Sequence, residues 1–244
     1  MSQGLVRSFL RTLLIQASWS YERMIGVGIA FASEPILRKL PGGLGGDKYR
    51  AALGRATAGF NSHPYFAGAA VGALGRAEHQ SLPTEQMARF RTALAGPLGS
   101  VGDKLVWAGT VPIASAIGLI LAVVVSPVIA VVVLLAIHNT VNVGLRVWAF
   151  RAGWYGGLSV ASRLDVPIMK WGLRLAGPAT AFSLGAMLPI TTVWLVSDFE
   201  PNAVTAVGIV AAVGILFARW LSPTLGSLRY GLIVVVLAAL AGWI

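Results

Sequence analysis

Side chains that could do chemistry gather at two places in the sequence, around Asn61-Ser62-His63-Pro64 and around Asp103. Ser62, His63 and Asp103 are the residue types of a hydrolytic triad. Adjacent residues rarely reach one another in triad geometry, however, and the chain has no Gly-x-Ser-x-Gly elbow. Amide, imidazole and carboxylate groups can instead hydrogen-bond the hydroxyl groups of a small solute. The sequence therefore favours binding, and we expect no catalytic nucleophile in this chain.

The same side chains also have a purely structural interpretation. Asn-x-His-Pro is a sound turn sequence in which side chains cap their own backbone. Asp103 lies in a stretch from Ala95 that reads as a loop rich in glycine and proline, and it can cap a helix starting at Lys104, a gain of about 0.5 to 2 kcal/mol. It can also pair with Arg23 or Lys104. Both interpretations stay open at this point.

Metal, thiol and nucleic-acid chemistry are not indicated. The 3 histidines are scattered without a spacing such as His-Glu-x-x-His, and cysteine is absent. We therefore expect no metal and no cofactor. A net charge of +10 could attract nucleic acid, but the positions of the basic residues favour membrane topology as its cause, and no nucleic-acid partner is expected.

Composition and hydropathy indicate an integral membrane protein. The chain is 56% hydrophobic and 11% charged, with a mean hydropathy of +0.76, whereas about a quarter of residues are charged in soluble domains. No charged residue occurs from Leu105 to Leu145, which is long enough for two crossings of a hydrocarbon core about 30 Å thick. A tight hairpin at Ser126-Pro127 would separate the crossings; a single long tilted or broken helix is the alternative. The predicted spans lie near residues 105–125, 128–145, 175–197, 202–218 and 230–244.

The basic residues predict the orientation of these spans. Most of the 19 Lys and Arg residues precede the first span. With the N-terminus in the cytoplasm, the others also fall on the cytoplasmic side, from Arg146 to Arg174 and at Arg219 and Arg229, and only Asp198 and Glu200 lie outside. The fold class is thus all-α, a multi-pass membrane protein of about five transmembrane helices, with residues 105–244 as its transmembrane domain.

Residues 1–104 are expected to form amphipathic helices on the cytoplasmic side. Apolar residues recur at near-helical spacing from Leu5 to Ile25, and the pattern ends at Pro41-Gly42-Gly43. This predicts a pair of amphipathic helices. They would lie on the membrane, on a partner or on the chain's own transmembrane domain.

A re-entrant hairpin is expected near residues 56–75. This stretch is uncharged and long enough to span, but Pro64 interrupts it, because proline lacks a donor and disfavours helical geometry before it. Broken backbone at membrane depth survives only within protein or along a water-filled cavity. The small residues that follow, Gly68, Gly72 and Gly75, would let another helix approach closely.

Four ordered segments resemble the signature blocks of a known family. They are Gln16–Met24 (QASWSYERM), Phe60–Gly68 (FNSHPYFAG), Gly96–Asp103 (GPLGSVGD), and Trp107 with Pro112; Asn142–Arg146 and Gly153–Gly157 continue them. On these motifs the chain, over about Arg7 to Gly157, is similar to component IID of the mannose/fructose/sorbose-type sugar phosphotransferase system. Gly153-Trp154-Tyr155 departs from the Gly-Tyr-Lys-like motif expected there.

The resemblance implies a subunit of a sugar-translocating hetero-oligomer in the bacterial cytoplasmic (inner) membrane. In that family this subunit pairs with membrane component IIC. Soluble IIA and IIB domains carry the phosphohistidines and relay phosphate to a hexose of the mannose class, so this chain is not itself phosphorylated. The basic N-terminal helices fit a phosphorylated partner and anionic membrane lipid.

The resemblance also suggests roles for single residues. Sugar contacts are expected at Asn61, His63 and Asp103. Interface or gating roles are expected at Glu22, Arg23, Pro64, Gly96, Pro97, Gly102, Trp107, His138, Asn142 and Arg146. Glu22 and Arg23 are expected to form an interhelical ion pair, because an unpaired charge near mid-membrane costs about 2.5 to 3.5 kcal/mol. His138 and Asn142, one helical turn apart, are expected to hydrogen-bond a partner such as IIC, and Trp107 to anchor at the interface.

Two other classes of function compete with this interpretation. A stand-alone transporter or channel would be expected to show internal symmetry, but the N-terminal half is broken and basic whereas the C-terminal half is plain and apolar. A structural or regulatory anchor for partner subunits would tolerate changes at Asn61, His63 and Asp103 without loss of uptake.

Overall fold

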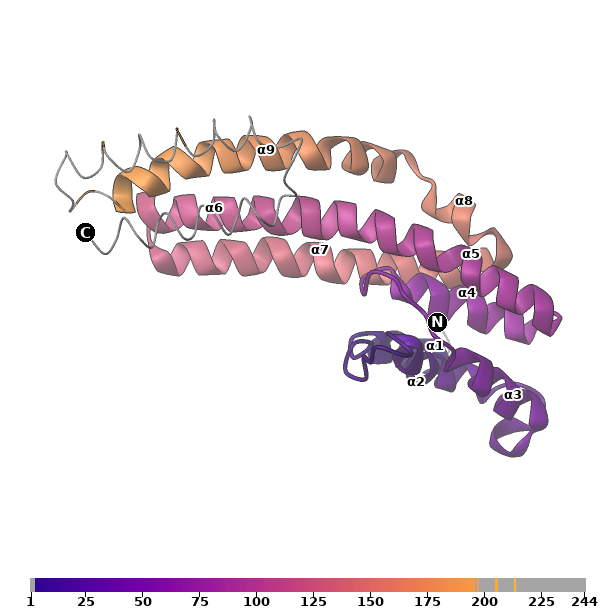
Figure 1. Cartoon of the computed structure of the whole chain (residues 1–244). Coiled ribbons are helices and arrows are strands. Elements are labelled where there is room, and N and C mark those ends of the chain that lie inside the picture. The colour runs from indigo at the N-terminus through magenta and orange to yellow at the C-terminus, as the bar shows by residue number, and fades with distance from the viewer. Residues whose placement is uncertain (1–2, 196, 198–204, 206–212, 214–244) are drawn as a thin grey trace. The chain divides into compact units, whose positions relative to one another are not determined.

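The computed structural model of the chain describes residues 3–195 together with 197, 205 and 213, and these form helices and connecting loops without a β-strand (Figure 1). The chain divides into two compact units, residues 1–190 and 191–244. The helices are α1 (Gln3–Thr12), α2 (Gly26–Leu37), α3 (Asp47–Ala56), α4 (Ala67–His79), α5 (Thr84–Gly102), α6 (Val111–Val124), α7 (Pro127–Gly156), α8 (Val160–Leu164) and α9 (Pro167–Leu195), with short helical turns at Gly43–Gly45, Asp103–Thr110 and Gly157–Ser159.

Three helical stretches of the described residues are long and apolar enough to cross a membrane: Thr84–Val124, Pro127–Leu164 and Pro167–Leu195. They contain or overlap the predicted spans at 105–125, 128–145 and 175–197. The predicted span 230–244 lies outside the described residues, and so does the span 202–218 except for residues 205 and 213. Asp198, Glu200, Arg219 and Arg229 also lie outside them. The all-helical membrane fold is confirmed, and the number of crossings stays a prediction.

The predicted loop between Ala95 and Lys104 is wrong, because this segment is helical. α5 continues through Gly96 and Pro97, and Asp103 has helical dihedral angles of φ −60° and ψ −44°. An N-cap residue has extended backbone, so Asp103 is not the cap that the sequence suggested. Buried Leu94 and Leu98, one turn apart, hold this helix against the core, and their packing outweighs the preference of proline and glycine for a loop. The predicted boundary between residues 104 and 105 falls in the helical turn Asp103–Thr110 that follows α5, and the division into two domains stays a prediction.

A π-helical turn at Asp103–Thr110 joins α5 to α6. Pro112 has no backbone N–H with which to bond the carbonyl oxygen of Ala108 four residues earlier. The hydroxyl group of Thr180 in α9 donates to that oxygen instead, at 2.8 Å. The interruption caused by Pro112 is therefore a point at which α9 is tied to the first spanning helix.

A tight hairpin joins α6 to α7, as predicted. Ser126 caps α7, with its Oγ accepting the Ile129 N–H at 3.3 Å, and Pro127 occupies the first helical position. A Cβ atom added to Gly118 would lie 3.0 Å from Leu134 Cδ1, and these residues are equally far from the turn. The two helices thus run back antiparallel, which excludes a single long helix.

The helix that approaches the glycines of α4 is α7 of the same chain (Figure 1). A Cβ atom added to Gly72 would lie 2.5 Å from the backbone nitrogen of Trp154, and one added to Gly153 would lie 2.2 Å from the Ala69 carbonyl oxygen. Backbone therefore meets backbone on both sides of this contact, and the predicted close approach is confirmed. Gly75 instead faces the side chain of Ile36 in α2.

The amphipathic helices at the N-terminus are shorter than predicted. α1 ends at Thr12 and α2 starts at Gly26, so most of the first signature block is not helical. Leu5 and Ile29 are buried in the core, and the Ser8 hydroxyl donates to the Ala32 carbonyl oxygen at 2.6 Å. The two helices therefore pack on the chain itself, while a contact with lipid stays a prediction.

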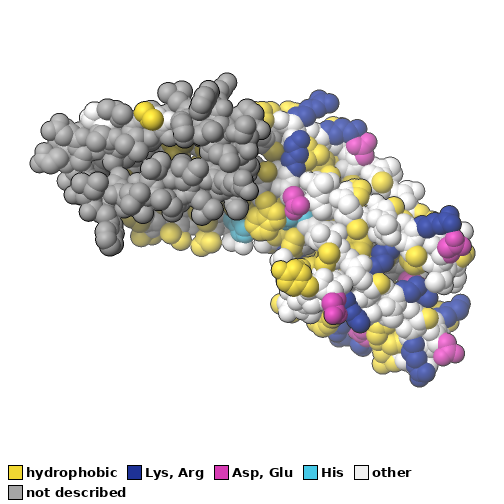
Figure 2. Space-filling view, in the orientation of Figure 1, with side chains coloured by type: hydrophobic (Ala, Val, Ile, Leu, Met, Phe, Trp, Pro, Cys, Tyr) yellow, Lys and Arg dark blue, Asp and Glu magenta, His cyan; other side chains and the backbone are white. Residues whose placement is uncertain are grey.

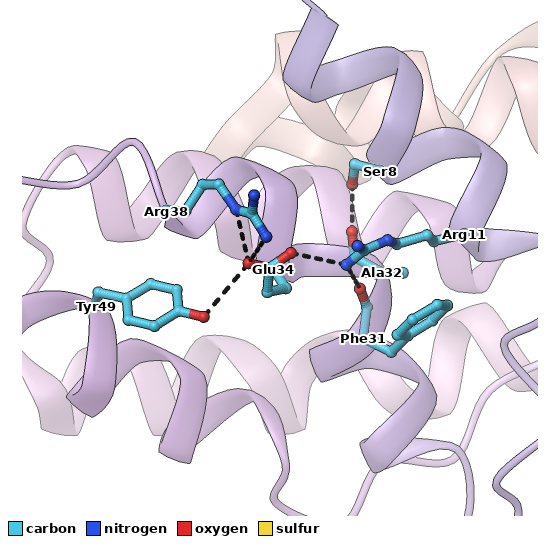
Figure 3. A network of polar contacts seen from close by, with 7 residues as sticks. All are labelled: Ser8, Arg11, Phe31, Ala32, Glu34, Arg38 and Tyr49. Carbon is cyan, nitrogen blue, oxygen red and sulfur yellow. Dashed lines mark hydrogen bonds and ion pairs between the residues drawn. The ribbon is translucent and has the colours of Figure 1, made fainter. Parts of the chain in front are cut away.

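Glu34 of α2 connects α1, α2 and α3 (Figure 3). Its carboxylate accepts hydrogen bonds from Arg11 at 2.7 Å, from Arg38 Nε at 2.7 Å and from the Tyr49 hydroxyl at 3.4 Å. Burial and, after it, the neighbouring Glu34 carboxylate raise the pKa of Tyr49 above its usual value. Arg11 and Arg38 thus share Glu34 as their acidic partner. Glu34 is the one acidic residue of α2, so this helix offers no second carboxylate to the other basic residues nearby.

Basic side chains gather over the helices of the N-terminal half, and the visible part of α7 beyond them is mainly hydrophobic (Figure 2). The cytoplasmic side expected for the basic residues after the second predicted span, Arg146 among them, stays a prediction. Arg146 and Arg151 both lie within α7, which runs to Gly156 before it ends, and Arg146 is only 7% exposed.

Candidate functional site

The candidate site is built around the loop from Thr57 to Phe66 between α3 and α4. Its backbone is not helical, so the predicted break at Ser62-His63-Pro64 is confirmed. The Ile25 N–H donates to the Phe60 carbonyl oxygen at 3.1 Å, and the Phe60 N–H donates to the Arg23 carbonyl oxygen at 3.3 Å. The first two signature blocks, distant in sequence, are therefore joined by backbone hydrogen bonds. The position of this loop at membrane depth stays a prediction.

His63 lies at the centre of the site, with 1% of its surface exposed. Its Nδ1 accepts the Tyr65 N–H at 3.2 Å, which places the ring hydrogen of the neutral form on Nε2. Nε2 has no hydrogen-bond partner among the described residues. A Cβ atom added to Gly102 would lie 2.1 Å from His63 Cβ, so only glycine permits this contact between the second and third blocks.

Trp107 covers the ring of His63. The two ring centroids are 5.3 Å apart, and Trp107 itself is half exposed. The fourth block therefore meets the other three at the same loop. Its predicted role as an interfacial anchor has no test in this geometry.

Tyr65 connects the loop to α7, and the sequence analysis missed it. Its hydroxyl group lies 3.1 Å from His138 Nε2, and the guanidinium carbon of Arg146 lies 4.9 Å from the ring centroid. A tyrosine in an uncharged stretch needs a partner for its hydroxyl group once buried, and that requirement was the available signal.

Arg146 ties α7 to the end of α1. Its Nη1 donates to the Thr12 carbonyl oxygen at 2.8 Å, and its Nε donates to the Asn142 side-chain oxygen at 2.7 Å. His138 and Asn142 each have a hydrogen-bond partner within the chain, because Tyr65 and Arg146 come within reach once the loop packs on α7. Their expected contact with a partner such as IIC stays a prediction.

Arg91 of α5 holds the base of the loop and was also missed. Its guanidinium group donates to the carbonyl oxygens of Ala56 and Ala58 and lies 4.9 Å from the ring centroid of Phe60. In the sequence, Arg91 is only one of many basic residues. A half-buried arginine that bonds backbone oxygens carries no distinctive sequence signal.

Other predicted residues lie on the surface around this cluster. Asn61 and Asp103 are exposed, and Asp103 is close enough to His63 for an electrostatic interaction. Gly96 and Pro97 are exposed on α5 away from the loop. The predicted interhelical ion pair of Glu22 and Arg23 is not found among the described residues. Both side chains are exposed in the turns before α2.

The geometry does not support a hydrolytic triad. The Ser62 hydroxyl is buried without a hydrogen-bond partner in residues 3–195, and His63 Nδ1 accepts from the Tyr65 backbone and not from Ser62. Among the described residues no group of three His, Cys, Asp or Glu side chains could hold a metal ion. The arrangement can position polar groups at a break in the helical scaffold, which is the chemistry of a binding or passage site.

This fold and site define a class of helical membrane protein. In it, a broken, proline-containing loop is held between the N-terminal helices and α7. Residues 2–193 match the sequence family described as the mannose/fructose/sorbose family IID component of the PTS system. The chain belongs to this family, which confirms the resemblance seen in the signature blocks.

Individual relatives agree with this assignment. The chain is 28% identical over 200 residues to the PTS system sorbose-specific EIID component of Klebsiella pneumoniae, with 80% of this chain and 71% of that protein covered. It is 25% identical over 186 residues to the mannose-specific EIID component of Escherichia coli (strain K12), with 74% and 65% covered. The chain thus spans about two thirds of the length of these relatives.

A solved structure shares the fold. The cryo-EM structure of the mannose transporter ManYZ in complex with microcin E492 contains a chain that superposes with a TM-score of 0.61 at 20% identity, covering 100% of this chain and 96% of that one.

Proposed function

We propose that this chain is the membrane subunit which, with a IIC partner, moves a hexose across the bacterial cytoplasmic membrane while IIA and IIB domains phosphorylate it. Membership of the IID family supports the class of complex. The observation that carries the proposal is the convergence of the four signature blocks on His63, a buried imidazole whose Nε2 has no hydrogen-bond partner in the part of the chain that the structure describes. Such a group is retained where a polar ligand or a moving element satisfies it.

We assign the sugar contacts to the surface around His63. The Asn61 amide and the Asp103 carboxylate are exposed and can reach sugar hydroxyl groups directly, whereas His63 is enclosed. Movement of the loop away from Gly102 and Trp107 would open His63 Nε2 to the same solute. The loop is thus proposed as a re-entrant part of the sugar path, with the N-terminus of the chain in the cytoplasm.

The remaining predicted residues are proposed to act at subunit contacts or in gating. Glu22 and Arg23 are exposed, and neither forms an ion pair with another described residue. They lie on a turn that is hydrogen-bonded to the loop, which suits contact with a IIC or IIB partner. Gly96 has open space around the position of a Cβ atom, so its face of α5 is free for another helix. The identity of the sugar follows from contacts that the subunits share, and the relatives named above differ in it.

The proposal is tested by uptake and phosphorylation of radiolabelled mannose, fructose and sorbose in cells that contain the IIA, IIB and IIC partners, with this chain present or deleted. Uptake that requires both this chain and the phosphate donor supports the proposal. Donor-independent uptake would indicate a stand-alone transporter, and uptake unaffected by deletion would indicate a structural or regulatory anchor.

Asn61→Ala tests the assigned sugar contact at residue level. The loss of one hydrogen bond to a hydroxyl group is expected to raise the KM for uptake by about 2- to 10-fold. Asn139→Ala is the matched control, because that exposed amide in α7 bonds only the Leu135 carbonyl oxygen of its own helix. Equal uptake by the two variants, at equal amounts in the membrane, would remove Asn61 from the sugar path.

A further inference from the structure

A second polar site lies away from the His63 loop, in a cavity of about 360 Å³ between α1, α2, α4 and the end of α7. This volume is in the range of small-ligand pockets. Lys39 and Arg76 line it, and none of the described residues lining it is acidic. An uncompensated pair of cations around one cavity attracts an anion.

Close contacts with glycine hold both cations at the cavity. A Cβ atom added to Gly4 would lie 3.0 Å from Lys39 Cε, and one added to Gly157 would lie 3.2 Å from Arg76 Cδ. Gly157 also has a positive φ of 52°, which other residues rarely adopt. The stems of the two side chains therefore lie close to the backbone of these glycines, and this places both charged ends at the cavity.

The nearby carboxylates are already engaged elsewhere. Glu34 is shared by Arg11 and Arg38 (Figure 3), and Glu78 binds Arg55 through two hydrogen bonds of 2.9 and 2.6 Å. Lys39 and Arg76 have no ion-pair partner in the part of the chain that the structure describes. The His79 ring, at the same cavity, is occupied by the Ile36 carbonyl oxygen at 3.1 Å.

The cavity continues toward a second one of about 140 Å³ that shares Gly4 and Lys39 and adds Arg7. Positive charge therefore extends along this side of α1. The floor of the first cavity, in contrast, is apolar and includes Leu5, Ile36 and the ring of Trp154. A ligand that fits both features has an anionic group and a hydrocarbon body.

Trp154 indicates the level of the cavity relative to the membrane. It lies in the last turn of α7, beyond Arg146 and Arg151, where the hydrophobic stretch of that helix has ended. Tryptophan rings and basic side chains meet at the headgroup level of a bilayer. Phosphate groups of anionic lipids are found at that level.

We propose that this cavity binds the phosphate group of an anionic phospholipid, with Lys39 and Arg76 on the phosphate and the start of an acyl chain against Trp154. The site is separate from the sugar path, so it can fail without affecting the proposed function. A soluble phosphate ester offers the same anionic group without the hydrocarbon body.

The test uses the full chain, purified in a neutral detergent and titrated with phosphatidylglycerol while native mass spectrometry counts the lipid retained. The double variant Lys39→Gln/Arg76→Gln is expected to weaken retention by about 30-fold. The control Lys48→Gln/Arg50→Gln removes two exposed charges from α3, outside the cavity, and is expected to change retention less than about twofold. Equal losses in both variants would overturn the proposal, because they would show general surface attraction.

A second variant tests the cavity without changing charge. Gln80→Trp fills the opening from an exposed position and is expected to lower retention of phosphatidylglycerol while the protein elutes as the parent does. Undiminished retention would overturn the proposed location. Inorganic phosphate at the same concentration is expected not to displace the lipid. If inorganic phosphate displaces phosphatidylglycerol, the site binds the phosphate group alone, and the phospholipid assignment would be wrong.

Discussion

Arg146→Gln is expected to separate α1 from α7 at a measurable cost in stability. The guanidinium group is 7% exposed and donates to the carbonyl oxygen of Thr12, which is itself 1% exposed, and to Asn142. A shorter amide leaves the Thr12 oxygen buried without a donor, which costs about 1 to 3 kcal/mol. The lost stacking on the Tyr65 ring adds about 0.5 to 2 kcal/mol.

Together these losses give about 1.5 to 5 kcal/mol, and the desolvation cost that the buried arginine no longer incurs reduces the destabilisation to about 1 to 4 kcal/mol. For a chain of this size that corresponds to a decrease in Tm of roughly 2 to 16 °C. The assay is thermal unfolding of the purified chain in detergent, followed by the loss of the monodisperse peak on size-exclusion chromatography.

Arg151→Gln is the matched control on the same helix, because its side chain is exposed and no hydrogen bond or ion pair in the described chain involves it. A change within about 0.5 kcal/mol is expected there. Arg146→Lys keeps the charge but cannot reach both acceptors in the same fork, so its Tm should fall between those of the parent and Arg146→Gln. A Tm for Arg146→Gln equal to that of the control would refute the assigned role.

Three further substitutions test the packing of the site. Gly153→Val forces a side chain into the backbone of α4, where a Cβ atom would already lie 2.2 Å from a carbonyl oxygen. This variant should destabilise the chain by about 3 kcal/mol or more. Gly144→Val, which has open space on the same helix, is the control and is expected to retain the parent elution profile. Glu78→Gln weakens the pair of the largely buried Glu78 with Arg55 of α3 and should cost about 1 to 3 kcal/mol in thermal unfolding. Glu85→Gln breaks a pair whose side chains are 78% exposed and should cost less than about 1 kcal/mol. Tyr65→Phe loses only the hydroxyl contact with α7, so we expect a loss of about 0.5 to 1.5 kcal/mol with uptake affected more than stability; unchanged uptake would mean that this contact is not part of the passage.

The membrane class and the broken loop could be predicted from the sequence because they depend on local features. The uncharged stretch after Leu105 and the missing donor of Pro64 act within a few residues. The glycines of α4 were also predictable as a close-packing face, although the partner, α7, was not named, because composition shows which face can be approached and not what approaches it.

The prediction of a loop between Ala95 and Lys104 was wrong because the structure of this segment depends on contacts with distant residues. Glycine and proline lower helix stability locally, but burial of Leu94 and Leu98 in the core is a tertiary effect that a local pattern does not contain. The roles of Tyr65 and Arg146 were missed similarly, because their partners are distant in the chain and meet only after the loop packs on α7.

The central claim, that the Thr57–Phe66 loop lines the sugar path, is tested most directly by labelling of Asn61→Cys. The chain contains no cysteine, so a single introduced thiol reports on one position. In membranes that contain the partner subunits, a soluble maleimide is expected to label this thiol, and the transported sugar is expected to slow the labelling severalfold, while Leu44→Cys, exposed and outside the loop, is labelled at the same rate with or without sugar. Labelling of Asn61→Cys that is indifferent to the transported sugar would contradict the claim.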